Sequence, residues 1–425
     1  MRSSRHRLTI AAFGVASIAM AIWLATFSLL SDAVNFLPHW DFKVYAAASD
    51  AFRAGKNPTI LKEITYYGAD IPYNYGPLFS RFFLPLFYGP RDLTEIGFVL
   101  VKIASVFAGC ALLTRALRRP LWYALPMFAL TGLMYGGALQ LDFNAGNISG
   151  FEFLEACLLV WAVIERRSAV FIAVLTLLCL GKPTWIVFSI LPAAYSMDRR
   201  AWKLAILSFV AVMASQGLSF ALYPQATMEF IRQGAKWREA GFLNPCLREC
   251  FGDIARVVGI PTKITKLLYA ATALLIPGGI LLLRHRLAKR LGAPSEGMEP
   301  SGETPRQNPL GAIGLTLFLF MPAFMPRYKV YSYTLLVPFL FAALLLLPIS
   351  WRARWGLALL AAFPFVYHFS ALLSLTGYDL SQKVGILVAY LPCYLAILVA
   401  VLVLRTVLKN VTTGANPQPT SQASL

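Results

Sequence analysis

Long runs of apolar residues alternate with short polar joints along nearly the whole chain. A helix that crosses the hydrocarbon core of a bilayer needs about 20 mostly apolar residues. Because that core holds no water to bind backbone groups, the pattern predicts a bundle of membrane-spanning helices. We expect an all-α polytopic membrane protein with one integral-membrane domain over residues 1–425. About twelve spans are predicted, at 8–30, 94–114, 120–137, 148–165, 168–181, 183–196, 202–223, 263–284, 309–325, 331–349, 354–374 and 384–405.

The run at 8–30 follows a short basic stretch, as it would in a secretory signal peptide. A signal peptide has a shorter apolar core and a small-residue cleavage site after it. Since this run is long and no clear cleavage site follows, we expect a retained first helix with a cytoplasmic N-terminus.

The basic residues agree with this layout. Cytoplasmic joints of membrane proteins carry an excess of Lys and Arg. With the N-terminus inside, every basic cluster falls on the inner side, and an even number of spans places the C-terminus there too. The expected location is the cytoplasmic (inner) membrane, with both termini in the cytoplasm. The clusters are Arg115/Arg118/Arg119, Arg166/Arg167, Arg199/Arg200, Arg284/Arg286/Lys289/Arg290, Arg352/Arg354 and Arg405/Lys409.

Composition supports the same class of protein. The chain is 58% hydrophobic and 14% charged, with mean hydropathy +0.63, whereas soluble domains carry roughly 25% charged residues. The formal charge of +18 resides in clusters at span ends, so it indicates membrane topology and not a nucleic-acid partner. Membrane lipids are the expected surroundings.

Two long outer loops are predicted, at 31–95 and 224–262. Within the first, the apolar segment 76–88 is too short for an easy crossing, so we expect a re-entrant or interfacial helix. Gly181-Lys182-Pro183 joins two short spans, which predicts that Lys182 lies in a cavity below the outer surface. The linker at 292–308 and the tail at 410–425 have the composition of flexible and disordered segments.

Asp41 is the strongest chemical candidate. It lies just past the first span, in the segment His39–Tyr45, and is flanked by aromatic and basic residues. A carboxylate at the bilayer surface suggests an enzyme that meets its substrate at the lipid boundary. The alternative is a helix cap, a position that Asp favours, because a short helix ending at Gly55 is predicted to follow. Tyr45 and Tyr75 are further candidates, or alternatively interface anchors.

Several short motifs, taken in order, resemble the polyprenol-phosphate-sugar-dependent glycosyltransferases of family 87. The resemblance extends from about Asp41 to Pro338, and its first-loop pattern is the most specific part. The matching motifs are Asp-Phe-x-Val-Tyr at Asp41, Gly-x-Asn-Pro at Gly55, Tyr-x-Pro-Leu at Tyr75, Gly146-Asn147, Lys182-Pro183 and Pro326–Tyr331.

Two positions depart from the family pattern. Gly76 follows Tyr75 where the family usually has Pro, and Asn144–Asn147 lacks the Gln of a Gly-Gln-x-Asn motif. These departures leave the expected fold intact and put the sugar and the acceptor in doubt.

The resemblance implies a GT-C membrane fold and an inverting sugar transfer on the outer face of the membrane. The donor would be a polyprenyl-phosphate sugar, mannose-like or arabinofuranose, and the acceptor a glycolipid or glycan of the cell envelope. Asp41 matches the family's catalytic aspartate, the general base for the acceptor hydroxyl, a role worth about 10²–10⁴-fold in rate. No cofactor is implied beyond the donor itself.

The phosphate that leaves carries negative charge, which fixed cations can stabilise. Lys182 is a candidate because ionisable residues at membrane depth are usually functional. Arg327 and Lys329, beside Tyr331, are candidates too, although side chains at a span end often extend to the interface. Asp142 and Asn147 are weaker candidates, with Asp142 expected near the acceptor. His368 is either functional or a packed core residue.

The remaining chemical candidates are metal-binding residues and a cysteine pair. Asp41 has no partner at Asp-x-Asp spacing and Cys/His clusters are missing from the sequence, so no metal is expected. Cys246 and Cys250 lie four residues apart in the second outer loop. On a helix their Cα atoms would lie about 6 Å apart, within disulfide range, but side-chain direction decides whether they pair.

Two other functions remain open. A lipid or solute transporter would tend to show related halves with broken helices at matching positions. The large first outer loop has no counterpart in the second half, which favours the enzyme. A structural subunit that has lost activity is the weaker alternative, suggested by the altered Pro and Gln positions.

Overall fold

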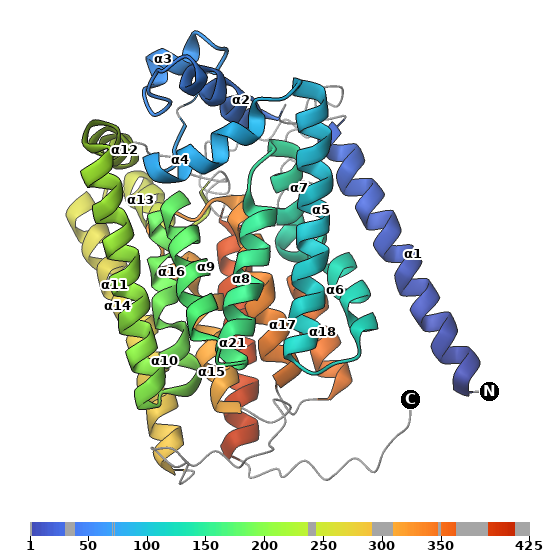
Figure 1. Cartoon of the computed structure of the whole chain (residues 1–425). Coiled ribbons are helices and arrows are strands. Elements are labelled where there is room, and N and C mark those ends of the chain that lie inside the picture. The colour runs from blue at the N-terminus through green and yellow to red at the C-terminus, as the bar shows by residue number, and fades with distance from the viewer. Residues whose placement is uncertain are drawn as a thin grey trace.

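A computed structural model describes residues 2–29, 39–69, 71, 73–236, 244–290, 309–346, 350–362 and 390–412. Within these ranges every regular element is a helix and none is a strand, so the all-α prediction is confirmed. Upright helices stand side by side, and several short helices lie across their upper end (Figure 1).

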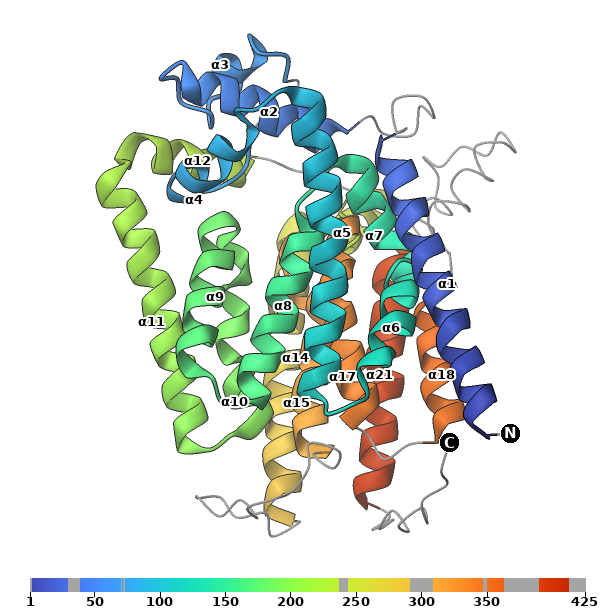
Figure 2. The same cartoon turned by 45° about the vertical axis from the view of Figure 1, so that its right-hand side comes forward.

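The first half of the bundle is built around α5, which packs along α8, while α1 packs on α6 and α7. The turned view in Figure 2 shows α9 and α11 on the far side of α8 from α1. The elements are α1 (Arg2–Leu29), α5 (Arg91–Ala116), η2 (Leu121–Tyr123), α6 (Ala124–Thr131), α7 (Met134–Ala145), α8 (Ser149–Ile164), α9 (Ser168–Gly181), η3 (Pro183–Ile190), α10 (Leu191–Ser196) and α11 (Arg199–Leu222).

The second half packs on the first through a stack of aromatic rings. Phe318 lies 5.5 Å from Phe188 and 4.7 Å from Phe339 between ring centroids. The elements are α12 (Pro224–Lys236), α13 (Leu247–Val258), α14 (Thr262–Arg290), α15 (Pro309–Leu319), α16 (Met321–Phe324), η6 (Val330–Leu336), α17 (Val337–Leu346), α18 (Trp351–Ala361) and α21 (Leu391–Thr412). α12 and α13 occupy the predicted second outer loop, and the helical residues 410–412 shorten the predicted tail.

Four helices are long and apolar enough to cross a membrane: residues 7–26 of α1, and α5, α11 and α14. The other apolar helices of the described part are shorter, and prolines account for several of the breaks. Pro183 begins η3, and Pro192 and Pro322 are the second residues of α10 and α16. Proline lacks an N–H and interrupts a helix. Twelve crossings are therefore not confirmed, and the predicted spans 354–374 and 384–405 reach into residues outside the described part.

A cap of short helices covers the upper end: α2 (Trp40–Arg53), α3 (Leu61–Thr65), α4 (Pro77–Phe83) and η1 (Leu84–Phe87). α2 is followed by Gly55 in the left-handed conformation, with φ +72°, as the sequence predicted. α4 and η1 form the short apolar helix expected at 76–88. The buried faces of α2, α4 and η1 share an aromatic cluster that contains Tyr45 and Tyr75. Both tyrosines are buried, so the interpretation as interface anchors is wrong.

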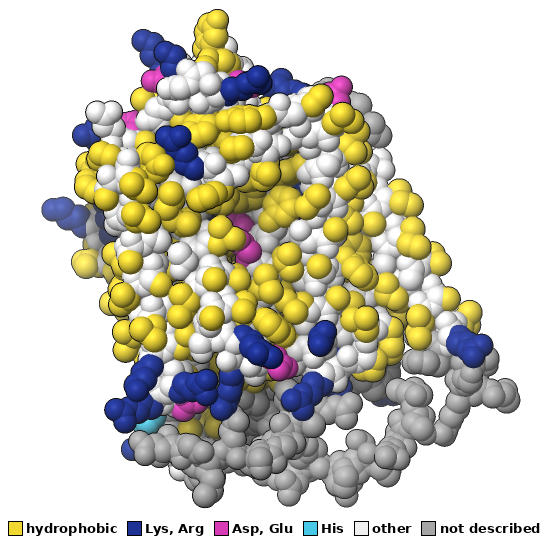
Figure 3. Space-filling model, viewed as in Figure 1, with side chains coloured by type: hydrophobic (Ala, Val, Ile, Leu, Met, Phe, Trp, Pro, Cys, Tyr) yellow, Lys and Arg dark blue, Asp and Glu magenta, His cyan; other side chains and the backbone are white. Residues whose placement is uncertain are grey.

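The surface of the bundle is mostly apolar between its two ends (Figure 3). Lys and Arg side chains gather at the lower end, where α5 finishes and α11 begins. A smaller group lies around the cap at the upper end. This banded surface is the one expected for a protein that spans a membrane.

Candidate active site

Asp41 lies in the first turn of α2 and is 9% exposed. The N-cap position belongs to His39, so Asp41 does not cap the helix. His39 is fixed in turn by the Ser28 hydroxyl, 2.9 Å from its Nε2, and by an ion pair with Glu95. The end of α1, the start of α5 and the start of α2 therefore meet directly beside Asp41.

Asn147 reaches Asp41 from the turn between α7 and α8. Its Nδ2 donates to Asp41 Oδ2 at 2.7 Å and lies 3.4 Å from the Tyr45 hydroxyl. The approach depends on Gly146, which has φ +67°, a conformation that favours glycine. A Cβ there would lie 2.6 Å from Phe42 Cβ. Glycine thus lets this turn touch α2 closely enough for the amide to orient the carboxylate.

The turn that carries Asn147 is held from behind by Lys102 of α5. The Lys102 ammonium lies 3.1 Å from Asp142 Oδ2. It donates to the backbone carbonyls of Asp142 at 3.0 Å and Asn147 at 2.8 Å. Gly150 makes room for this side chain, because a Cβ there would lie 2.5 Å from Lys102 Cγ.

Asp142 is sealed inside this arrangement. Its carboxylate accepts the backbone N–H groups of Ser149 at 2.8 Å and Gly150 at 3.0 Å, which are among the first N–H groups of α8. Its side chain and that of Lys102 are both 0% exposed. The expectation that Asp142 contacts the acceptor is therefore corrected: its carboxylate is fully buried, where it fixes the turn at the start of α8.

Two phenols complete the surroundings of Asp41. The hydroxyls of Tyr45 and Tyr75 lie 2.8 Å apart. Burial raises the pKa of Tyr45 well above its usual value, and nearby Tyr75, Asp41 and Tyr331 raise it further. Burial likewise raises the pKa of Tyr75, with a second contribution from Asp41. Both phenols therefore stay protonated and act only as hydrogen-bonding groups.

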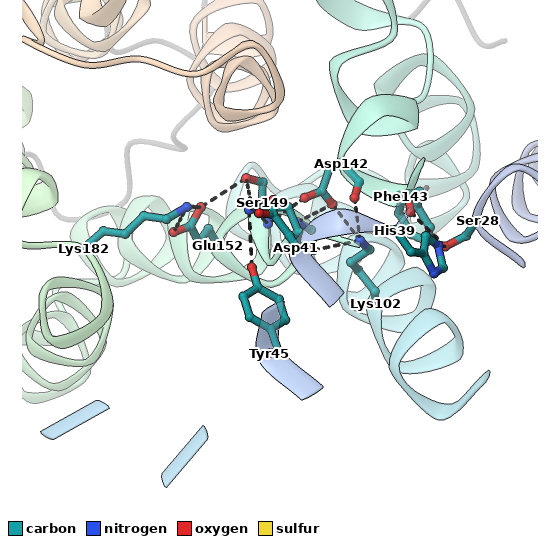
Figure 4. A network of polar contacts seen from close by, with 12 residues as sticks. Ser28, His39, Asp41, Tyr45, Lys102, Asp142, Phe143, Ser149, Glu152 and Lys182 are labelled. Atoms are coloured by element: carbon teal, nitrogen blue, oxygen red, sulfur yellow. Dashed lines mark hydrogen bonds and ion pairs between the residues drawn. The ribbon is translucent and has the colours of Figure 1, made fainter. Parts of the chain in front are cut away.

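Lys182 lies in the turn between α9 and η3, as expected, but it does not stand alone. Its ammonium lies 2.8 Å from Glu152 Oε1, and the two side chains are 20% and 2% exposed. Glu152 also accepts from Trp185 Nε1 at 3.2 Å and from the Ser149 hydroxyl at 3.2 Å. Figure 4 shows the first part of a connected network, in which Glu152 accepts from the Lys182 ammonium and from the Ser149 hydroxyl. The Ser149 N–H donates to Asn147 Oδ1 at 3.2 Å, and Asn147 Nδ2 donates to Asp41, so the network reaches the carboxylate.

Lys329, just before η6, and Tyr331, within η6, join this group. The Lys182 ammonium lies 5.9 Å from the Tyr331 ring centroid and 5.8 Å from that of Tyr75. The Lys329 ammonium lies 5.6 Å from the same Tyr331 ring. Two cations and two aromatic rings are therefore brought together from three distant segments. Arg327 is half-buried in the turn that carries Lys329, and His368 lies outside the described residues.

Sequence reasoning missed Lys102 and Glu152, although a general signal marks both. Each is a charged residue inside a predicted apolar span, and such residues usually have a functional or structural partner. Attention to ionisable residues within spans, not only in loops, would have found them.

The other chemistry considered from the sequence is settled in part. Cys246 and Cys250 are both free, so the disulfide is not formed. Cys250 Sγ lies 3.0 Å from the Tyr394 hydroxyl, whereas Cys246 Sγ lies against the Pro326 carbonyl. Burial raises the pKa of Cys246 to about 11, which disfavours the reactive thiolate. Within the described residues no group of three or more His, Cys, Asp or Glu could hold a metal ion.

The arrangement combines a positioned carboxylate with nearby cations. A carboxylate that accepts from an amide can also accept a proton from a bound hydroxyl. Cations fixed beside aromatic rings can stabilise charge that develops on a leaving phosphate. Together the two parts suit group transfer from a phosphate ester.

Comparison with known proteins agrees with this chemistry. The profile of glycosyltransferase family 87 matches residues 73–297, more than half of the chain. The search of curated proteins and the search of solved structures gave no match.

Proposed function

Because the chain belongs to glycosyltransferase family 87, we propose that it is an inverting enzyme that uses a polyprenyl-phosphate sugar. The sugar, mannose-like or arabinofuranose, would pass to a glycolipid or glycan acceptor on the outer face of the cytoplasmic membrane. The apolar body supports a donor that arrives through the lipid. The described helices hold no strand–helix nucleotide fold that would accept a soluble nucleotide sugar.

Asp41 would act as the general base. It takes the proton from the acceptor hydroxyl while that oxygen attacks the anomeric carbon. The new carbon–oxygen bond forms as the bond to the phosphate oxygen breaks on the opposite side, so the configuration inverts. Asn147 holds the carboxylate in one orientation through the 2.7 Å bond to Oδ2, and the proton transfer is worth about 10²–10⁴-fold in rate.

The phosphate that departs would be held by Lys182, with Lys329 and Arg327 nearby. Lys182 is 20% exposed, so an incoming phosphate can reach its ammonium. Its bonds to Glu152 would weaken as the phosphate forms its own charge-assisted hydrogen bonds. In this proposal Glu152 keeps the lysine in place before the donor binds.

The bond between Asn147 and Asp41 is the observation that carries this proposal, because it brings two separate family motifs into one site. The test is Asp41→Asn in full-length protein reconstituted with a polyprenyl-phosphate sugar donor. Transfer should fall by about 10²-fold or more, while membrane insertion and thermal unfolding stay close to the parent.

Asp50→Asn is the matched control, since Asp50 lies in the same helix, is half exposed and is 3.9 Å from Arg91. It should leave transfer unchanged. Full activity in Asp41→Asn would reject the base. Movement of an intact donor across the membrane, with no glycosidic bond formed by the parent, would favour the transporter instead.

A further inference from the structure

A cavity of about 380 Å³ opens at the upper end of the molecule, away from the residues of the proposed active site. It lies where the end of α2, the start of α4 and the corner between α11 and α12 meet. None of the residues assigned above to Asp41, Asn147 or Lys182 chemistry lines it. The cavity is large enough for a small ligand or a headgroup.

Its walls are tied together across long distances in sequence. Gln233 of α12 donates to the backbone carbonyl of Thr59, which lines the cavity after α2. Thr59 is itself fixed by Asn57 Oδ1, which accepts its N–H at 3.1 Å and its hydroxyl at 2.7 Å. The cavity is therefore formed by segments that are distant in sequence, and not by one loop alone.

The charged side chains that line the cavity are both cationic. Lys56 and Arg81 line it, and the described lining residues include no Asp or Glu. Two carboxylates lie behind the lining residues: Glu63 accepts the Asn57 N–H at 2.6 Å, and Glu229 accepts from Gln233 Nε2 at 3.4 Å. A cavity with two cations and no acid favours an anionic ligand.

Arg81 is held in a way that suits phosphate. Its guanidinium lies 4.8 Å from the Phe52 ring centroid and 4.7 Å from that of Tyr223, so two aromatic rings flank it. Contact with the rings restrains the guanidinium and leaves its N–H edge for a ligand. A guanidinium edge binds phosphate through two parallel hydrogen bonds.

The cavity lies at the upper end of a candidate membrane span, where we expect lipid headgroups. Leu222, the last residue of the candidate span α11, lines it and is 54% exposed. One turn below, Leu218 is 51% exposed on the same face. Phe82, next to Arg81 on α4, is 67% exposed. Apolar surface for acyl chains thus leads up to a cationic cavity.

We propose that this cavity binds the phosphate of an anionic bilayer lipid, whose acyl chains lie along the exposed flank of α11. The site is separate from the sugar-transfer reaction and does not depend on it. Bound lipid would fasten α4 and the end of α2 to the α11–α12 corner.

The test uses the full chain in phosphatidylcholine nanodiscs that contain a minor fraction of dioleoyl phosphatidic acid. Native mass spectrometry measures how much phosphatidic acid remains bound when the protein is released. Arg81→Gln should lower retention about tenfold, as expected when charge-assisted hydrogen bonds are lost. Lys56→Gln should lower it less, because Lys56 is exposed and has no aromatic support.

Arg53→Gln is the matched control. Arg53 lies at the end of α2 with its guanidinium 5.9 Å from the Tyr88 ring, but it does not line the cavity. Equal retention in Arg81→Gln and Arg53→Gln would overturn the proposal. Full displacement of phosphatidic acid by inorganic phosphate at equal concentration would overturn the lipid assignment. Asp41→Asn should retain lipid normally, so failure of this inference and failure of the proposed transferase are distinguishable.

Discussion

Two lysine–carboxylate pairs lie on either side of Asn147, and they differ in their access to solvent. Lys102 and Asp142 are both 0% exposed. Lys182 is 20% exposed, while its partner Glu152 is 2% exposed. The first pair is closed on every side, whereas the second presents its cation to the space beside Tyr75 and Tyr331.

The difference teaches which charges can take part in chemistry. Both members of a fully buried ion pair lose their hydration. Removal of one partner leaves an uncompensated buried charge, which destabilises the protein. Because both side chains are 0% exposed, neither water nor substrate reaches Lys102 to replace Asp142. Lys182 can exchange its partner for a phosphate. We therefore infer a positioning role for Lys102 and a binding role for Lys182.

The turn at 147–152 joins the two pairs. Lys102 fixes the backbone carbonyl of Asn147, while Ser149 donates to Glu152. Asn147 then points its amide at Asp41. A change at either pair should therefore affect Asp41. The two pairs act through different contacts, so the size of the effect should differ.

Lys102→Met should give the largest effect. It leaves the Asp142 carboxylate buried without its cation, which destabilises by about 3–5 kcal/mol. We expect a large fall in folded yield and in the unfolding temperature, measured by fluorescence-detected size exclusion in detergent after heating. Any protein that folds should transfer sugar poorly, because the turn that carries Asn147 has lost its anchor.

Lys102→Met combined with Asp142→Asn is the informative companion. Neutralising both charges removes the buried anion, so folding should recover in part. Lys62→Met, at an exposed position of α3, is the control and should behave as the parent. A Lys102→Met protein with unchanged unfolding temperature would show that the closed pair is not structural.

Lys182→Ala should give the next largest effect, confined to the donor. Loss of the phosphate contact should raise the donor KM about tenfold or more, equivalent to 1.4 kcal/mol or more, with the acceptor KM nearly unchanged. The measurement is initial rate against each substrate in turn. Because this change leaves Glu152 buried and unpaired, Lys182→Ala/Glu152→Gln is the matched variant.

That double variant should regain stability without regaining donor affinity. If its donor KM returned to the parent value, the defect of Lys182→Ala would be structural, and the distinction between the two pairs would fail.

The sequence predicts the residues in short motifs better than the charged residues inside apolar runs. Asp41, Asn147 and Lys182 occur in short recognisable motifs next to turns, so pattern alone marks them. Lys102 and Glu152 lie within apolar runs, and the partner of Lys102 is 40 residues away. Such a pairing depends on how α5 packs against the α7–α8 turn, which no local pattern contains.

The same limit applies to the fold. Hydropathy identifies apolar runs and so predicts the helical class, which the structure confirms. The break at Pro183 was predicted, but the apolar pattern did not show that 183–196 divides into η3 and α10, or that 309–325 divides into α15 and α16 near Pro322. The number of crossings therefore depends on backbone geometry that apolar composition does not determine.

Glu152→Gln should change the donor KM by less than Lys182→Ala does, and in the opposite direction. The amide keeps the shape and can still accept from Trp185, but Lys182 loses its counter-ion. Phosphate then no longer competes with a carboxylate, so the donor KM should fall a few-fold while stability declines slightly. Competition binding of a polyprenyl phosphate measures this directly. A raised donor KM would mean that Glu152 itself contacts the donor.

Tyr75→Phe should have the smallest effect of these variants, and it tests the surroundings of the Lys182–Glu152 pair. The ring below Lys182 remains, and only the hydrogen bond to the Tyr45 hydroxyl is lost. Burial holds the pKa of Tyr75 well above its usual value. The phenol is therefore protonated throughout the pH range in which activity is measured. The variant should therefore keep the donor KM and the alkaline limb of the pH–rate profile, with only a small loss in kcat. Tyr66→Phe, at a residue that is 86% exposed, is the control. A shift of the alkaline limb in Tyr75→Phe alone would mean that the phenol ionises during turnover. The Lys182–Glu152 pair would then lie beside a titrating phenol.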